Sequence, residues 1–152
     1  ASDAHTRWLA LSLDCPQLPH LCLAGLHSNH SISEVIRQCP RLSNLQVSLS
    51  IALETTTIAH HTLKVLHIAR IEKMHTLYLA TPNLSRLFTE ACVGLTSIIP
   101  YPAKNLELVY TPGTNGLTPD TRVLLTRANP NGTTIHPTFP TKTLFPDMIP
   151  RP

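Results

Sequence analysis

The chain has 152 residues, of which 42% are hydrophobic and only 14% are charged, and its formal net charge is +3. This length suits one domain with a substantial core, whereas so mild a charge argues against the clustered basic face that nucleic acids require. A surface with so few charges indicates that a partner, a larger assembly or sugars cover part of it.

A leucine figure, L-x-x-L-x-L or a close variant, recurs along the chain. Its copies begin at Leu18, Leu42, Leu63, Met74, Leu84 and Leu95, and the stretch "NLELVY" keeps part of it in Leu106 and Leu108. In a short strand alternate side chains point to one face, so the fourth and sixth positions of each copy should point inward. One winding cannot bury its apolar face alone, so windings should stack and share a core. We therefore predict an α/β solenoid of parallel strands with few helices.

The copies at Met74 and Leu95 fall midway between their neighbours. This half-step predicts windings with a strand on both faces of the solenoid, at least over residues 63–100.

The stretch "SISEVIRQC" predicts a helix instead of a strand. Ser31 is expected to cap the helix, and Glu34, three residues later, completes a capping box. The side chains expected to face the core are Ile32, Val35 and Ile36. The early windings should therefore pair a strand with a helix.

A second helix is predicted in "TPDTRVLLTRANPNG". Thr118 should cap it, Pro119 suits the first turn and Asp120 suits the positive end of the helix. Asn129-Pro130 should end it. The side chains expected on its covered side are Val123, Leu124 and Ala128. This helix is expected to close the open end of the solenoid.

Proline divides the chain, because ten of its 14 prolines lie from Pro100 onward. We predict a solenoid at residues 1–110, a capping loop and helix at 111–130, and a proline-rich extended tail at 131–152. The tail's candidate apolar anchors are Phe139, Leu144, Phe145, Met148 and Ile149.

The four cysteines show no C-x-x-C pair and no zinc spacing. Cys15 and Cys39 each precede proline, which favours a small buried residue at a corner of the repeat over a disulfide. Cys22 and Cys92 complete the set.

No motif of a hydrolase or of a nucleotide-binding site is present, so we expect no catalytic residue and no cofactor. The histidines that come closest to a metal cluster are His20, His27 and His30, and the pair His60–His61 with His67. Their spacing lacks the i, i+4 pairing that places two imidazoles on one helix face. Surface or corner positions are expected for them, and no metal site.

Three asparagines match the N-x-[ST] pattern of glycosylation. Asn83 follows Pro82 at a corner, where an asparagine ladder or a turn hydrogen bond is expected in place of a glycan. Asn29 and Asn131 are the better candidates if the protein is secreted.

The stretch "ISEVIRQCPRLSNLQVS" resembles the helix, Cys-Pro-x-Leu and strand unit of leucine-rich repeats in F-box proteins. "LKVLHIARIEKMHTLYLATPNLSRLFTEAC" resembles the plant-type version of that repeat, and the likeness covers residues 15–110. The most diagnostic units are Cys39-Pro40-x-Leu42 and Thr81-Pro82-x-Leu84. F-box helices do not precede the repeats in this chain, and its end matches no domain of the family.

The resemblance implies a scaffold that recruits the substrate of a ubiquitin ligase, and a repeat region that binds without catalysing a reaction. The residues expected to form its protein-binding strand face are His20, Cys22, Asn44, Gln46, Val65, His67, Thr76, Tyr78 and Arg86. The alternative is a structural subunit of a large assembly whose proline-rich tail docks on neighbours.

No apolar run is long enough to span a membrane and no signal peptide pattern is present at the start, so we expect a cytoplasmic or nuclear protein. A secreted protein is the alternative, and the chain is also expected to be processed or partial because it begins at Ala1. The protein partner is left open.

Overall fold

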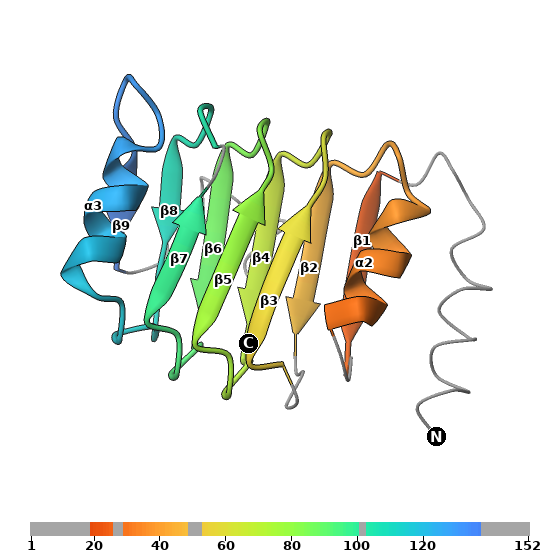
Figure 1. Cartoon of the computed structure of the whole chain (residues 1–152), viewed down its shortest axis with the longest axis horizontal. Helices are drawn as coiled ribbons and strands as arrows, with labels where there is room; N and C mark the ends of the chain where they lie inside the picture. The colour runs from red at the N-terminus through yellow and green to blue at the C-terminus, as the bar shows by residue number, and fades with distance from the viewer. Residues whose placement is uncertain (1–18, 26–28, 49–52, 101–102, 138–152) are drawn as a thin grey trace, which may run out of the picture.

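The computed structural model describes residues 19–25, 29–48, 53–100 and 103–137. It is a parallel β-solenoid in which the chain winds alternately through two sheets, as Figure 1 shows. This confirms the predicted solenoid of parallel strands with few helices.

The larger sheet, sheet A, has six strands in the order β1-β2-β4-β6-β8-β9, each parallel to its neighbours. Its strands are β1 His20–Ala24, β2 Asn44–Ser48, β4 Val65–Ala69, β6 Arg86–Glu90, β8 Leu108–Tyr110 and β9 Thr134–His136. The smaller sheet, sheet B, has three parallel strands. They are β3 Thr55–Ala59, β5 Thr76–Ala80 and β7 Ser97–Pro100. The half-step copies of the leucine figure thus form the second sheet, as predicted.

Two helices take the place of sheet B strands at the two ends of the solenoid. Helix α2 (Asn29–Arg37) follows β1 and packs against β3, and helix α3 (Pro119–Arg127) follows β8 and packs against β7 and β9. Each sheet B edge is therefore covered by a helix, which protects it from pairing with another chain.

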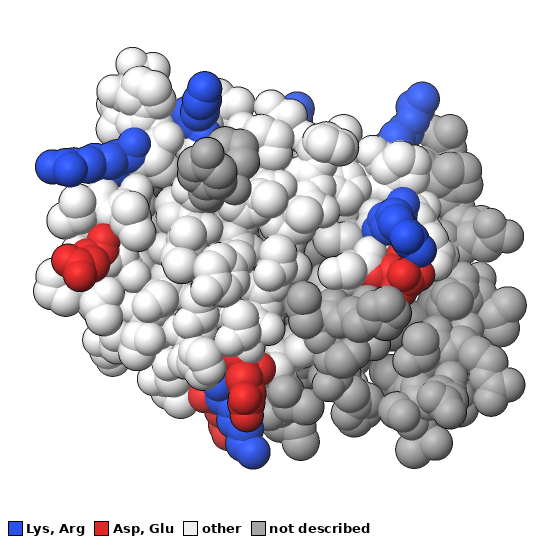
Figure 2. Space-filling model, in the orientation of Figure 1, with Lys and Arg blue, Asp and Glu red and all other residues white. Residues whose placement is uncertain are grey.

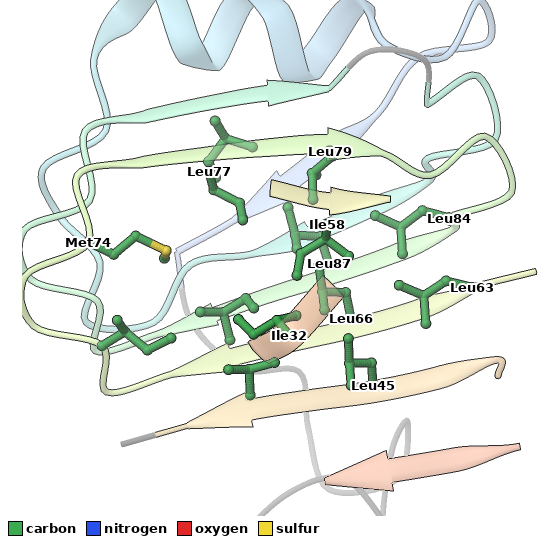
Figure 3. Close-up of a cluster of buried hydrophobic side chains, with 14 of the residues drawn as sticks. Ile32, Leu45, Ile58, Leu63, Leu66, Met74, Leu77, Leu79, Leu84 and Leu87 are labelled. Atoms are coloured by element: carbon green, nitrogen blue, oxygen red, sulfur yellow. The ribbon is translucent and has the colours of Figure 1, made fainter. Parts of the chain in front are cut away.

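The core lies between the two sheets and is filled by the inner positions of the leucine figures. Leu66 and Leu87 face inward from sheet A, and Leu77 and Leu79 face them from sheet B, all at most 1% exposed (Figure 3). In β8 the inward side chain is Val109, whereas Leu108 is only half-buried. This agrees with the figure counted from Leu106, in which Val109, not Leu108, occupies the inward fourth position.

Helix α2 begins at Asn29, two residues before the predicted cap, so Ser31 lies inside the helix and does not precede it. Ile32, Val35 and Ile36 are buried, as expected. The spacing of these apolar residues therefore predicted the covered face correctly, although the start of the helix was predicted two residues too late.

Helix α3 has the predicted start, because the hydroxyl of its N-cap Thr118 accepts a hydrogen bond from the Thr121 amide at 3.2 Å. Its covered side was predicted wrongly for Val123 and Leu124, whereas Ala128 packs against the core as expected. Val123 and Leu124 are 47% and 48% exposed, whereas Thr121 and Leu125 are buried. Residues four apart share a helix face, and the face that meets sheet B is the one that carries Thr121.

The corner that follows each described strand of sheet A from β4 to β8 uses one residue with positive φ. Gly113 adopts it at 70°, which glycine tolerates without cost. Arg70 and Ala91 adopt it at 56° and 51° although they carry a Cβ. Their amides donate to the carbonyls of Glu90 and Pro112 in the next winding, which stabilises the unusual conformation.

Sheet A extends beyond the predicted boundary at residue 110. Strand β9 lies in the segment that was expected to be a tail, and it pairs in parallel with β8. Residues 138–152, with the proposed apolar anchors of the tail, lie outside the described residues.

Cys39 and Cys92 are buried free thiols, and Cys39 sits at a corner of the solenoid, as expected for a cysteine that precedes proline. Burial raises the pKa of the Cys92 thiol, which keeps it protonated and inert. Cys22 is exposed on β1, and Cys15 lies outside the described residues.

Candidate interaction face

The residues expected to form one binding face lie on two opposite faces of the solenoid. Those on sheet A are His20, Cys22, Asn44, Gln46, Val65, His67 and Arg86, and those on sheet B are Thr76 and Tyr78. A single partner surface cannot include all of them. The half-step position of the copy at Met74 already indicated that Thr76 and Tyr78 belong to the second sheet, so the expected single face was inconsistent with the repeat pattern.

His67 occupies an outward position on β4, yet it is only 2% exposed. Its Nε2 lies 3.2 Å from a carboxylate oxygen of Glu90 on the neighbouring strand. Burial is the largest effect on this imidazole and lowers its pKa below 6.5, although the Glu90 carboxylate opposes the shift. His67 therefore cannot serve as an exposed contact residue, and that expectation was wrong.

The outer face of sheet B, here called the Tyr78 face, carries no charged side chain. It consists of the outward side chains Thr55, Thr57, Ala59, Thr76, Tyr78, Ala80, Ser97 and Ile99. In Figure 2 the Lys, Arg, Asp and Glu side chains of the described residues lie toward the periphery of this side of the molecule. Tyr78, on the middle strand, is 41% exposed.

Strand register explains why Tyr78 lies at the centre of this face. Tyr78 lies opposite Thr57 on β3 and opposite Ile99 on β7. Neighbouring strands lie about 4.8 Å apart, so these side chains form one continuous row. The row offers a hydroxyl, an aromatic ring and an aliphatic group without any charge to desolvate.

Helix α2 lies beside β3 and helix α3 lies beside β7, so one helix flanks the Tyr78 face at each edge of sheet B (Figure 1). At the α3 edge the helix is attached through Thr121, whose hydroxyl accepts from the Ile98 amide at 3.4 Å and donates to the Thr96 carbonyl at 3.3 Å. The helix thus continues the hydrogen bonding of the sheet and holds the face in a fixed shape.

A groove of about 500 Å³ runs along the other edge, between α2 and sheet B. Its lining residues are Ser33, Ile36, Arg37, Pro40, Thr57, Ala59, His60, His61 and Ala80. Arg37, at its rim, pairs with the Glu34 carboxylate at 2.8 Å within the same helix. The groove is mostly apolar and open, which suits a side chain or a short peptide segment better than a charged small molecule.

His60, which lines the groove, is held by one local hydrogen bond and by one hydrogen bond to the preceding winding. The Thr62 amide donates to Nδ1 of His60 at 3.2 Å, and Nε2 of the same ring lies 2.7 Å from the Cys39 carbonyl. Nδ1 is therefore the acceptor, and the ring donates its Nε2 proton to Cys39. His60 is tied into the corner, as expected for a corner histidine.

Asparagines form a short ladder at the same end of the windings. Nδ2 of Asn83 donates to the His61 carbonyl at 2.6 Å, and Nδ2 of Asn105 lies 3.3 Å from Oδ1 of Asn83. This confirms the expected ladder at Asn83.

The two remaining sequons differ in what the structure describes of them. Asn131 is exposed, and its amide donates to Oδ1 of Asn129 at 2.9 Å. The hydroxyl of Thr133, two residues later, is buried and donates to the Leu106 carbonyl at 2.8 Å. Asn29 is the first residue of α2, and its side chain lies outside the described part of the structure.

Within the described ranges, no three or more His, Cys, Asp or Glu side chains gather as metal ligands would. Among the same residues, neither helix has the length and apolar character needed to cross a membrane.

Comparisons with family models, with curated proteins and with solved structures gave no match for this chain.

Proposed function

We propose that this protein is a protein-interaction module whose partner docks on the Tyr78 face. The observation that carries the proposal is the exposed ring of Tyr78 at the centre of an uncharged surface between two helices. Interface cores are depleted in charged residues, and tyrosine is among the side chains that contribute most binding energy.

The groove beside α2 adds a place where the partner could anchor. Thr57, Ala59 and Ala80 belong both to the groove and to the Tyr78 face, so one ligand can contact both. The parallel strands of sheet B hydrogen-bond to one another along the face, and a surface that is ordered before binding lowers the entropic cost of association.

The test uses the full chain as bait in its native cells, with substitutions on the face and a matched control. Tyr78→Ala removes the central ring and Thr57→Glu places a charge in the row. Val93→Ala alters a side chain that is 65% exposed on a corner. A partner that is kept by the wild type and by Val93→Ala but lost with the two face variants supports the proposal. Unchanged capture by both face variants, in samples with wild-type thermal unfolding, refutes it.

As the narrower proposal, we infer that the module recruits the substrate of an F-box-type ubiquitin ligase. The Cys39-Pro40-x-Leu42 and Thr81-Pro82-x-Leu84 units support this through their resemblance to leucine-rich repeats of that family. The chain alone should fail to bind the ligase adaptor. Fused behind an F-box, it should increase ubiquitylation of the captured partner, and Tyr78→Ala should abolish the increase. Adaptor binding by the chain alone, or a fusion without effect, contradicts this step.

A second candidate is a structural subunit of a large assembly. The low charged fraction of 14% and the exposed apolar pair Val123 and Leu124 on α3 favour it. Size-exclusion chromatography of the isolated chain separates the two candidates. A self-sufficient module elutes as a monomer, whereas a subunit removed from its assembly aggregates, and Val123→Ser with Leu124→Ser should then reduce the aggregation.

A further inference from the structure

Four rings form a continuous row on the outer face of sheet A, here called the aromatic row: His67, Phe88, Tyr110 and His136. They occupy equivalent positions in β4, β6, β8 and β9. The ring centroids of Phe88 and Tyr110 are 4.9 Å apart and those of Tyr110 and His136 are 5.2 Å apart, both in stacked geometry. His67 and Phe88 are 5.5 Å apart with tilted rings.

The aromatic row points away from the core, yet three of its four rings are buried. His67 and Phe88 are each 2% exposed and Tyr110 is 3% exposed. Sheet B and both helices lie on the other side of sheet A, so no described element covers these rings (Figure 1). Stacking in the row shields the ring faces but not their outer edges. These three residues also have interaction partners besides those named above.

Burial along the same outward row falls off toward β1. Gln46 on β2 is only half-buried and Cys22 on β1 is exposed. Whatever covers the row therefore lies over β4, β6 and β8. This is the part of sheet A that adjoins β9, after which the chain continues into residues 138–152.

We propose that the C-terminal segment, residues 138–152, docks on the aromatic row and closes the outer face of sheet A. Its sequence, "TFPTKTLFPDMIPRP", combines apolar side chains with prolines. Proline-rich segments in the polyproline II conformation bind to surfaces lined with aromatic rings, because their conformation is already restricted before binding. Phe139 and Phe145 supply rings of the kind that pack against Phe88 and Tyr110.

Chain length and position favour this segment over the N-terminal one. Fifteen residues in a polyproline II conformation extend roughly 45 Å, whereas the three strand steps from β9 to β4 cover only about 14 Å. Residues 1–18 join the solenoid at β1, the opposite edge of sheet A, where Cys22 is exposed. The other segments outside the described residues, 26–28, 49–52 and 101–102, are two to four residues long and joined to described residues at both ends, so they are too short to extend across β4, β6 and β8.

The two outer faces of the solenoid would then have different roles. The chain closes sheet A with its own C-terminal segment, and the Tyr78 face stays open to a partner. This inference is independent of the proposed function, because it concerns the opposite side of the molecule.

The test is hydroxyl-radical footprinting of the full chain, read by mass spectrometry at Tyr110 and Tyr78. The variant Phe139→Ser with Phe145→Ser leaves every described residue unchanged. We expect oxidation of Tyr110 to rise several-fold in this variant, while that of Tyr78, already 41% exposed, stays constant. Trp8→Ser, in the N-terminal segment, is the matched control and should leave Tyr110 protected.

Limited trypsin cleavage at Lys142 gives a second readout in the same proteins. Docking should protect the bond after Lys142 in the wild type, and Phe139→Ser with Phe145→Ser should accelerate its cleavage. Circular dichroism confirms that the variant keeps its fold. Unchanged protection of Tyr110 in the tail variant overturns the proposal, and a rise in Trp8→Ser alone assigns the cover to the N-terminal segment instead.

Discussion

Leu66 on β4 lies directly opposite Leu87 on β6, and both side chains are completely buried between the two sheets. The two residues belong to successive windings with the same leucine figure, so each supplies part of the surface that buries the other. Their pairing is the basic unit of this solenoid.

Leu87→Ala should therefore destabilise the protein by about 2–5 kcal/mol, because it removes buried methyl groups and leaves a cavity between windings. Denaturant unfolding measures the change. Val93→Ala, at a position 65% exposed, should change the free energy of unfolding by less than about 0.5 kcal/mol. Similar losses in both variants would mean that the shared core does not carry the stability.

Thr56→Val should stabilise the protein by about 1 kcal/mol. The Thr56 hydroxyl is buried and has no hydrogen-bond partner among the described residues. The equivalent position in the next winding holds an apolar side chain, Leu77, so an apolar residue suits this site. Valine has nearly the same shape and avoids the cost of burying a hydroxyl without a partner. Thr55→Val on the exposed side is the control. Loss of stability in Thr56→Val would show that the hydroxyl is hydrogen-bonded in solution.

Gly94→Ala should destabilise the protein by about 1–3 kcal/mol, because an added Cβ would lie 2.6 Å from the Glu72 carbonyl oxygen of the preceding winding. Gly116, one winding later, leaves 3.1 Å to the Leu95 carbonyl, so Gly116→Ala should cost less. Thermal unfolding ranks the two variants. A stabilised Gly94→Ala, as expected where alanine fits without strain, would contradict the close approach of the windings.

His67 should make the protein less stable in mild acid. Burial lowers the pKa of His67 in the folded protein, whereas in the unfolded chain His67 has its ordinary pKa of about 6.5. Between these two pKa values the unfolded chain binds a proton at His67 and the folded protein does not, so acid favours unfolding. The stability is therefore complete above about pH 6.5 and declines as the pH falls toward the folded pKa, by at most about 1.4 kcal/mol per pH unit.

Unfolding of the wild type and of His67→Gln between pH 7.5 and 5 isolates this contribution. The wild type should lose more stability than His67→Gln over this range, whereas His61→Gln, at an exposed position, should follow the wild type. Parallel curves for all three proteins would exclude a buried neutral His67.

The sequence predicts the sheets well because strand periodicity is local. Leu45, Leu66 and Leu87 recur at the same place in each figure, so their inward direction follows from alternation along the strand. The N-cap of α3 at Thr118 could also be predicted from the sequence, because a cap depends on only a few neighbouring residues.

The functional faces could not be assigned in the same way, because they depend on residues far apart in the chain. Tyr78 and His67 both occupy outward positions in their strands, yet Tyr78 is 41% exposed and His67 is 2% exposed, because the burial of an outward side chain depends on the residues that lie over it. A signal for the aromatic row was present, since His67, Phe88 and Tyr110 occupy the same position in alternate copies of the figure. Val123 and Leu124 were wrongly predicted on the covered side of α3, because nine residues give too few helical turns for the apolar periodicity to identify the buried face.

The parallel stacking of successive windings is tested most directly by nuclear Overhauser contacts in the full chain with labelled methyl groups. The structure predicts contacts between Leu66 and Leu87 in sheet A and between Leu77 and Ile98 in sheet B, together with the backbone contacts of parallel strands. Backbone contacts of antiparallel pairs in residues 63–100, or no contact between Leu66 and Leu87, would contradict the solenoid and the division of its faces.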